Sequence, residues 1–310
     1  MPIPRGPSKP PATGGNNGNA EGTGEGDNQD TPRVVRPAVK YSGPIKWQKL
    51  SVRSRRHVIA IIRGPDQSGK SHWALTAPDP IAVLTFDPAN FDGVANNLGA
   101  DSRDIQMISF EMPKGLVATR ELAQIAAQET ARLQAYFLDA VNGSYFRTVV
   151  LDREDEVWEL HRYEEFDGKS SAKSHHYTQL NMAYKAMLKM AEKNNKNLIM
   201  IDAMSAEYKA NQPTGRMKRD GFKHLGMLSQ LELEAIVDDY GNFSIQVVKC
   251  RDNATRNGVI MKPEVISEVV AANGGSWPED PNSETGYGYF PLTFENVMSY
   301  LTGGAPDDWR

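Results

Sequence analysis

Cysteine is almost absent from this chain of 310 residues, which contains only Cys250. One cysteine excludes an internal disulfide and a zinc site built from several cysteines, and it is typical of a protein from a reducing compartment. Long apolar runs are lacking too, since no run approaches the length that crosses a bilayer and the first residues have no signal-peptide core. We therefore expect a soluble, cytoplasmic protein without membrane contact.

An excess of charge of one sign is also missing. The 35 basic and 39 acidic side chains leave a formal net charge of −4, which excludes a globally basic protein and leaves only local clusters for nucleic-acid contact. Only 6 histidines are present, and no H-E-x-x-H or comparable spacing joins them. A zinc site at His161, His175 and His176 is therefore not expected, and solvated histidines are the simpler interpretation.

Apolar side chains are scarce in residues 1–40, where glycine, proline and asparagine are abundant. Such a composition cannot offset the entropy of ordering, so we expect a flexible tail, with a tethering role as the alternative. One domain is expected from residue 41 to residue 303, followed by a short tail of residues 304–310. Residues 257–289 receive no assigned role.

From Tyr41 onward, short β-rich apolar runs alternate with stretches of helical periodicity. This alternation is typical of an α/β protein whose mostly parallel sheet binds ligands at the carboxyl ends of its strands. Strands are expected at His57–Ile62, Pro80–Phe86, Ile105–Phe110, Phe146–Leu151 and Asn197–Ile201, with a hairpin at Leu231–Val237 and Phe243–Val248. Helices are expected at Leu122–Val141 and Tyr177–Asn194, and a strand and a helix within Phe290–Leu301.

Residues 64–71 carry a complete phosphate-binding motif, G-P-D-Q-S-G-K-S, which fits G-x-x-x-x-G-K-[ST]. The motif follows an apolar strand and opens a helix, so its glycines allow backbone N–H groups to approach phosphates. Lys70 is expected to reach the β and γ phosphates and Ser71 to bind Mg²⁺. ATP is preferred to GTP because no N-K-x-D motif is present. The nucleotide-binding residues predicted are Gly64, Pro65, Asp66, Gln67, Ser68, Gly69, Lys70, Ser71 and His72.

Acidic residues at the ends of two strands supply the other groups that ATP hydrolysis requires. Asp152 follows the apolar run V-V-L and is expected to hold the metal's water shell, with helix capping as the alternative. Asp87, at the end of the second strand, is preferred to Glu154 as the residue that orients or deprotonates the attacking water. Most acidic residues just after Asp152 are expected to form the solvated start of a helix.

With these motifs in this order, the sequence resembles the RecA-like ATPase core, and within it the small phage-type AAA ATPases related to single-strand annealing proteins. The resemblance covers Arg56 to Asn257 and includes a strand ending at Asp202 and a late K-C-R at residues 249–251. It implies a three-layer fold with a mostly parallel central sheet, a late antiparallel hairpin, and DNA recombination in a host cytoplasm if the chain is phage-encoded. The family usually has glutamate where this chain has Asp87, so the hydrolysis rate is left open.

The resemblance also implies roles for residues farther along the chain. The residue at the position of Asp202 senses the γ phosphate in the family, but an aspartate there would be repelled by phosphate, so this role is weak. Lys249 and Arg251 would stabilise transition-state charge on the nucleotide of a neighbouring subunit, which implies a homo-oligomer. The alternative is that both simply finish a hairpin.

Single-stranded DNA would be bound by the segments after the third and fourth core strands, Phe166–Gln179 and Glu207–His224 in this chain. Both segments mix cations with aromatic residues, as single-strand grooves do, and Tyr208 and Phe222 are expected to be available for stacking. Solvated loops are the alternative. The DNA-binding residues predicted are Lys169, Lys173, His175, His176, Lys209, Arg216, Lys218, Arg219 and Lys223.

Three functions are compatible with these motifs. The first is a DNA-stimulated ATPase that acts in recombination or single-strand annealing. The second is a nucleotide-gated binding module that hydrolyses ATP slowly. The third is a small-molecule kinase, although Arg216–Arg219 would make a short phosphate lid for one.

Overall fold

The computed structural model describes residues 57–89, 91, 93–94, 103–113, 119–166, 177–209, 212–219, 221–272, 292–303 and 309. The tail of residues 1–40 lies outside the described residues, as do Lys169, Lys173, His175 and His176. The side chains of Tyr208 and Arg216 are likewise not described.

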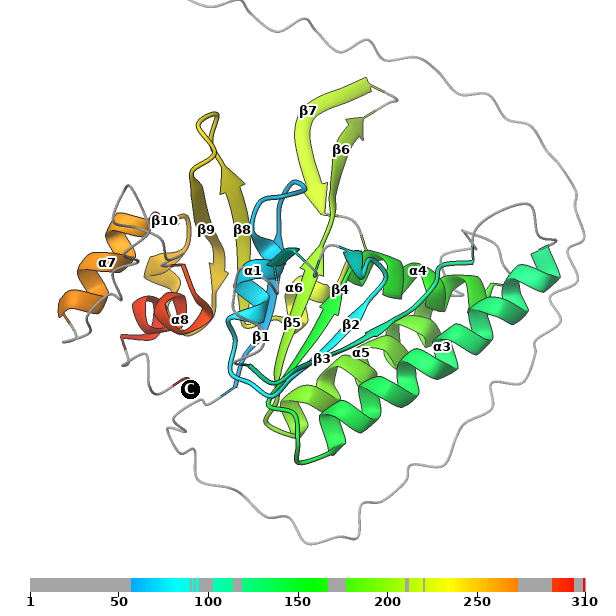
Figure 1. Ribbon diagram of the computed structural model, residues 1–310. Helices are drawn as coiled ribbons and strands as arrows, with labels where there is room; N and C mark the ends of the chain where they lie inside the picture. Colours follow the sequence, from blue (N-terminus) through cyan, green and yellow to red (C-terminus); the bar gives the residue numbers. More distant parts are fainter. Residues whose placement is uncertain are drawn as a thin grey trace, which may run out of the picture. The chain divides into compact units, whose positions relative to one another are not determined.

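Strands and helices alternate along the described chain (Figure 1). The strands are β1 (Ile59–Arg63), β2 (Ile81–Thr85), β3 (Ile105–Ser109), β4 (Thr148–Asp152), β5 (Asn197–Asp202), β6 (Met204–Lys209), β7 (Gln212–Arg219), β8 (Leu231–Val237), β9 (Phe243–Cys250) and β10 (Ile260–Met261). The helices are α1 (Lys70–Leu75), α3 (Thr119–Asn142), α4 (Glu154–Glu165), α5 (Tyr177–Lys193), α6 (Leu225–Leu228), α7 (Pro263–Ala272) and α8 (Phe294–Thr302), with a 3-10 turn at Ala254–Arg256.

The main sheet has the strand order β10-β9-β8-β1-β5-β4-β2-β3. The strands from β8 to β3 run parallel, and β9 and β10 add to the β8 edge in antiparallel fashion. The mostly parallel sheet and the late hairpin of β8 and β9 are therefore confirmed. Because β1 lies between β5 and β8, the loop that follows β1 lies beside the carboxyl ends of both neighbours.

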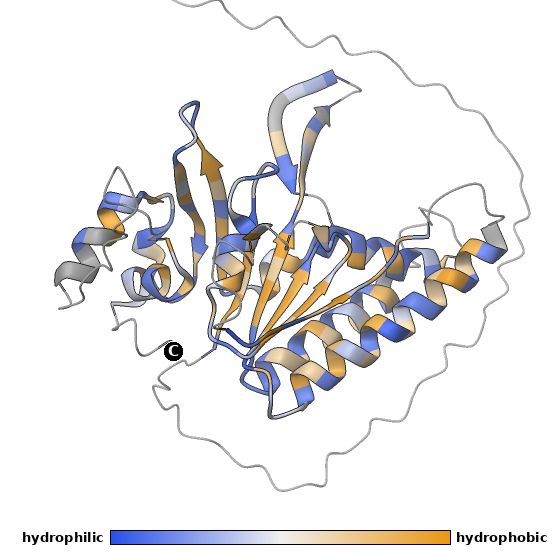
Figure 2. Cartoon of the chain, in the orientation of Figure 1, coloured by the Kyte–Doolittle hydropathy of each residue, from blue (hydrophilic) through white to orange (hydrophobic). Residues whose placement is uncertain are grey.

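Helices cover both faces of the sheet, which makes the fold three-layered. Alternate residues of β1 show why: Ala60 and Ile62 pack with residues of α1 and α8, whereas Ile59 and Ile61 pack with residues of α3, α4 and α5. Strands buried on both faces need apolar residues at every position, and the central strands are uniformly hydrophobic in Figure 2. The apolar runs that predicted these strands have this physical origin.

A second, two-stranded sheet consists of β6 and β7 alone. It projects from the carboxyl side of the main sheet and is far more polar than the central strands (Figures 1 and 2). The sequence predicted a loop across Glu207–His224, so the hairpin is a correction. Its strands lack the apolar alternation that marks a half-buried strand, because no layer packs over them to demand it.

The C-terminal part of the described chain adds to the β8 edge. Residues that had no assigned role form β10 and the whole of α7. The helix predicted within Phe290–Leu301 is α8, which begins after Thr293, whose side chain caps the N–H of Asn296. Of the strand predicted just before it, Leu292 and Thr293 are described, and neither is in a strand. None of the described helices is long and apolar enough to span a membrane.

Candidate functional site

The loop between β1 and α1 requires glycine at two positions. Gly64 has a φ of 154°, and a Cβ there would lie 2.5 Å from the carbonyl oxygen of Ala235 and 2.8 Å from Ser68 Oγ. Gly69, immediately before α1, has a φ of 81°, in the left-handed region. The first glycine of the motif is thus required by its close neighbours and the second by its backbone conformation.

Lys70 extends across this loop. Its Nζ donates to the carbonyl oxygens of Gly64 at 3.0 Å and Pro65 at 2.5 Å, and Ser68 Oγ also donates to Pro65 at 2.8 Å. Burial lowers the pKa of Lys70, while nearby Asp66 and Asp152 oppose that shift. The ammonium group is therefore held at the loop, where it can neutralise phosphate charge.

Thr85 joins two of the predicted acidic residues. Its Oγ1 donates to Asp152 Oδ2 at 2.6 Å and accepts the backbone N–H of Asp87 at 2.9 Å. Thr85 and Asp152 face each other at the carboxyl ends of β2 and β4. Burial raises the pKa of Asp152 to about 6, although the Thr85 hydroxyl opposes the rise. Sequence reasoning missed Thr85, since a threonine at a strand end carries no motif.

A cavity of about 720 Å³ opens over the loop and the carboxyl ends of the parallel strands. It brings together the predicted residues from Asp66 to His72 with Asp87, Asp152 and Asp202, although Glu154 does not line it. The full lining consists of Asp66, Gln67, Ser68, Gly69, Lys70, Ser71, His72, Asp87, Ala89, Gly93, Val94, Asp152, Arg153, Ile201, Asp202, Ala203 and Phe243.

Arg153 lines the cavity, and the sequence did not single it out. It has a φ of 69°, an uncommon conformation for a residue with a side chain, at the junction of β4 and α4. Its guanidinium pairs with Asp155 at 3.0 Å and with Glu156 at 3.3 Å, both in the first turn of α4. A cation is thus held next to Asp152, and only the residue's position after a strand-ending aspartate could have indicated it.

Glu154 does not belong to a solvated helix start, so that prediction is wrong for this residue. Its side chain is fully buried and accepts the Tyr184 hydroxyl at 2.8 Å and the backbone N–H of Phe222 at 3.5 Å. Asp202, also fully buried, lies within hydrogen-bonding range of Glu154, and Arg219 pairs with Asp202 at 3.1 Å. Burial raises the pKa of both carboxyl groups, and Glu154 raises the pKa of Asp202 further. Burial also raises the pKa of the Tyr184 hydroxyl, and the neighbouring Glu154 and Asp202 add to that rise.

The predicted DNA-binding residues of the second segment divide into two groups. Lys209, Lys218 and Lys223 are exposed, whereas the side chain of Arg219 turns inward and is 13% exposed. Phe222 is not available for stacking on a base, since it is 1% exposed. Its ring lies 4.7 Å from that of Trp158, in a buried aromatic cluster.

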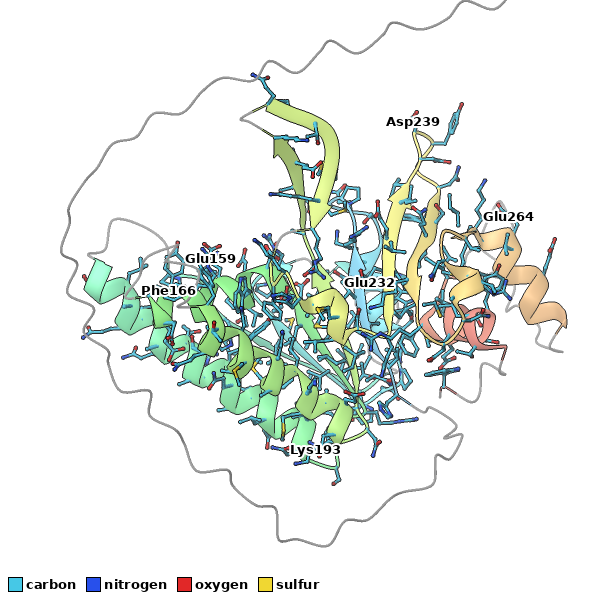
Figure 3. All side chains as sticks on the ribbon, turned by 180° about the vertical axis from the view of Figure 1, so that it is seen from behind. Glu159, Phe166, Lys193, Glu232, Asp239 and Glu264 are labelled. Carbon is cyan, nitrogen blue, oxygen red and sulfur yellow. The ribbon has the colours of Figure 1, made fainter. Side chains whose placement is uncertain are left out.

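Lys249 and Arg251 lie at the end of the sheet opposite the cavity. Figure 3 labels Asp239 at the tip of the β8–β9 hairpin and Glu232 near its base, and Lys249 pairs with Glu232 at 3.3 Å. Lys249 also donates to the carbonyl oxygens of Gly226 and Ser229, and Arg251 donates to that of Met227. Their action on a neighbouring subunit's nucleotide stays a prediction.

His161 is buried rather than solvated, so the sequence interpretation is wrong for this histidine. Its ring packs edge-on against Tyr184 with centroids 5.2 Å apart, and burial lowers its pKa to about 4. Within the part of the chain that the structure describes, no three His, Cys, Asp or Glu side chains form a group that could hold a metal. The oxygen donors Ser71 and Asp152 of the cavity are nevertheless of the type that suits Mg²⁺.

Two comparisons with known proteins bear on this site. Residues 56–270 match the AAA_24 family, which is described as an AAA domain. No curated protein matches the chain. The matched region begins just before β1 and includes every residue that lines the cavity.

Proposed function

The chain belongs to the AAA domain family of P-loop nucleoside triphosphatases, which bind and hydrolyse ATP, and from this premise we propose that single-stranded DNA stimulates its ATP turnover. The process we propose is DNA recombination or single-strand annealing, carried out by a homo-oligomer. The observation that carries the proposal is the β6–β7 hairpin, which begins two residues after Asp202 at the cavity wall and presents Lys209 and Lys218 to solvent.

The triphosphate would be held by the loop of residues 64–71, with Lys70 against its β and γ phosphates. Ser71 and Asp152 would hold Mg²⁺, which when bound neutralises and aligns the phosphates. The buried Asp152 carboxylate supports this assignment, since a cation would remove the cost of ionising it away from water.

Asp87 is the residue that we assign to the attacking water. It lines the cavity, whereas the alternative, Glu154, is buried among Tyr184, Asp202 and the backbone of Phe222. The backbone N–H of Asp87 is fixed by Thr85, which also holds Asp152. This shared partner sets the spacing between the proposed base and the proposed metal ligand.

DNA contact would occur on the outer part of the β6–β7 hairpin and on Lys223 just after it. Single strands bind mainly through their phosphates, so exposed lysines supply affinity that weakens with salt. Figure 3 shows the hairpin carrying its side chains clear of the main sheet, with Lys193 far away at the opposite end of the view. The positions of these lysines support a strand-binding surface close to the nucleotide cavity.

The test combines strand affinity with ATP turnover. In the variant Lys209→Gln/Lys218→Gln, affinity for a fluorescent oligothymidine should fall, and the slope of log affinity against log salt should shrink by about 1.4, or 0.7 per lost phosphate contact. The matched control Lys189→Gln/Lys193→Gln removes the same charge from exposed positions on α5 and should keep the parent slope. Equal slopes in the two variants, or no effect of the oligonucleotide on ATP turnover, would contradict the proposal.

A gated module that hydrolyses slowly is the second candidate, favoured by the short side chain of Asp87. In that case the oligonucleotide would bind in an ATP-dependent manner while phosphate release stayed near its basal rate. Phosphate release in the absence of any small acceptor would separate both candidates from a kinase.

A further inference from the structure

Both ends of the β6–β7 hairpin meet at the nucleotide cavity. β6 begins two residues after Asp202, and the last residue of β7, Arg219, lies opposite Met204, the first residue of β6. Asp202 in turn lies beside Arg63 at the end of β1, one residue before the phosphate-binding loop. The hairpin therefore leaves and rejoins the core at a single place, next to Asp202 and Ala203 in the wall of the cavity.

Arg219 joins the base of the hairpin to the core through an ion pair with Asp202. Its Nε lies 3.1 Å from Asp202 Oδ2, and its Nη2 donates to the carbonyl oxygen of Phe222 at 2.8 Å. Asp202 has no exposed surface, and apart from this ion pair neither of its carboxylate oxygens has a hydrogen bond with good geometry among the described residues. The carboxylate at the cavity wall thus depends for its position on a cation that the hairpin carries.

The segment that follows Arg219 is locked into the core. Gly221 has a φ of 80°, and a Cβ there would collide with Glu154 Oε2 and lie 3.1 Å from the Cα of Asp155. The backbone N–H of Phe222 points to Glu154, and its ring is buried against Trp158 and Tyr184. Glu154 and Asp155 are the first residues of α4, the helix that follows Asp152. The segment after β7 therefore packs on the helix that begins next to the proposed metal ligand.

The outer part of the hairpin pairs within itself, as Thr214 Oγ1 does with Glu207. β6 and β7 pair only with each other among the described strands, and they project beyond the main sheet in Figure 1. A ligand bound on the outer hairpin would therefore act on the core through its base, where the ion pair of Arg219 with Asp202 links the hairpin to the cavity wall. Conversely, a change in the position of Asp202 on nucleotide binding would be passed to the hairpin through Arg219.

We propose that Arg219 is a positioning residue that couples the nucleotide cavity to the β6–β7 hairpin through its buried ion pair with Asp202. This inference rests on the proposed function, in which the cavity turns over ATP and the hairpin binds a polyanionic strand. It also reassigns Arg219, since a guanidinium committed to Asp202 and Phe222 is not part of the strand-binding surface. Coupling between two sites is reciprocal, so the nucleotide must affect the hairpin as the strand affects turnover.

The test measures hydrogen exchange of residues 204–219 with and without a non-hydrolysable ATP analogue and Mg²⁺. In the parent, the analogue should protect residues 64–71 and change exchange in the hairpin by about fivefold or more. Arg219→Met alone would leave two buried carboxyl groups without their cation, so the informative variant is Asp202→Asn/Arg219→Met, which removes both charges. It should keep protection at 64–71 and lose the response of the hairpin.

Two matched variants separate coupling from a structural role. Arg219→Lys, which keeps the cation, should retain part of the response, and Lys189→Gln, which removes an exposed charge from α5, should retain all of it. With saturating oligothymidine, the double variant should lose the stimulation of ATP turnover while its KM for ATP stays within about twofold of the parent value, since a lost positioning interaction changes turnover rather than binding.

The outcomes distinguish this inference from the function on which it rests. Protection at residues 64–71 without any response of the hairpin in the parent would overturn the coupling, as would a full response in the double variant. No protection at 64–71, or a hairpin that responds to nucleotide but binds no oligonucleotide, would instead count against the proposed function.

Discussion

The substitution Thr85→Val removes one buried hydroxyl group behind the cavity wall, where it contacts Asp152, and keeps the shape of the side chain. Thr85 is fully buried, so water cannot replace the hydroxyl. Its loss would deprive Asp152 of the 2.6 Å bond to its carboxylate and the Asp87 N–H of its 2.9 Å acceptor. Both groups belong to the proposed catalytic site, so the variant should lose stability and ATP turnover together.

The loss of stability follows from the two bonds. A hydrogen bond to a charged group contributes about 1.5–3 kcal/mol and one between neutral groups about 0.5–1.5 kcal/mol, so the free energy of unfolding should fall by about 2–4.5 kcal/mol. For a domain of this size, 1 kcal/mol shifts Tm by about 2–4 °C, which predicts a decrease in Tm of about 4–18 °C.

Thermal melting at pH 8 measures this effect, since the pKa of about 6 leaves Asp152 ionised there. Thr85→Ser is the matched control, because it keeps the hydroxyl and should melt within a few degrees of the parent. If Thr85→Val melts together with Thr85→Ser, the hydroxyl does not hold Asp152 and Asp87 as described, and the reasoning about the spacing of base and metal ligand fails.

Three further substitutions test other parts of the account. Burial lowers the pKa of His161 to about 4, so the unfolded chain takes up the imidazole proton at a higher pH than the folded chain does. The free energy of unfolding of the parent should therefore fall by about 3 kcal/mol between pH 6.5 and 4, and that of His161→Phe should not show this fall. Urea unfolding of both proteins at the two pH values measures the difference. Asp87→Asn should reduce turnover by about 10²–10⁴-fold with ATP affinity retained, and an unchanged rate of phosphate release would exclude Asp87 as the base. Gly64→Ala should cost about 1–3 kcal/mol, because its Cβ would lie 2.5 Å from the Ala235 carbonyl oxygen, and should abolish ATP binding by calorimetry; normal binding would show that the loop tolerates a side chain.

Much of the main sheet could be predicted from the sequence because its strands are buried on both faces. A strand such as β5, N-L-I-M-I-D, reads as one apolar run that ends in a polar residue, and this signal is local. The residues of β6 and β7 gave no such signal, because these strands pair only with each other among the described strands and are not buried between two layers of helices. α7 was missed because no motif marks Pro263–Ala272 and its partners in the core are distant in sequence.

The candidate site divides in the same way. The residues of the phosphate-binding loop and the aspartates that end β2 and β4 could be predicted, because their spacing and the preceding apolar runs are contiguous. The interior position of Glu154 and the pairing of Arg219 with Asp202 could not, because they depend on a chain that leaves the sheet for 16 residues and returns to it. The sequence around a charged residue at a strand end is the same whether that residue faces water or a buried partner, so it does not distinguish the two cases.

ATP turnover of the parent and of Lys70→Ala, each with and without single-stranded DNA, tests the central claim most directly. The account predicts that DNA raises phosphate release by the parent, and that loss of the ammonium group held at Gly64 and Pro65 reduces turnover by about 10²–10³-fold under both conditions. Turnover by Lys70→Ala equal to that of the parent would show that the loop of residues 64–71 is not where ATP is hydrolysed.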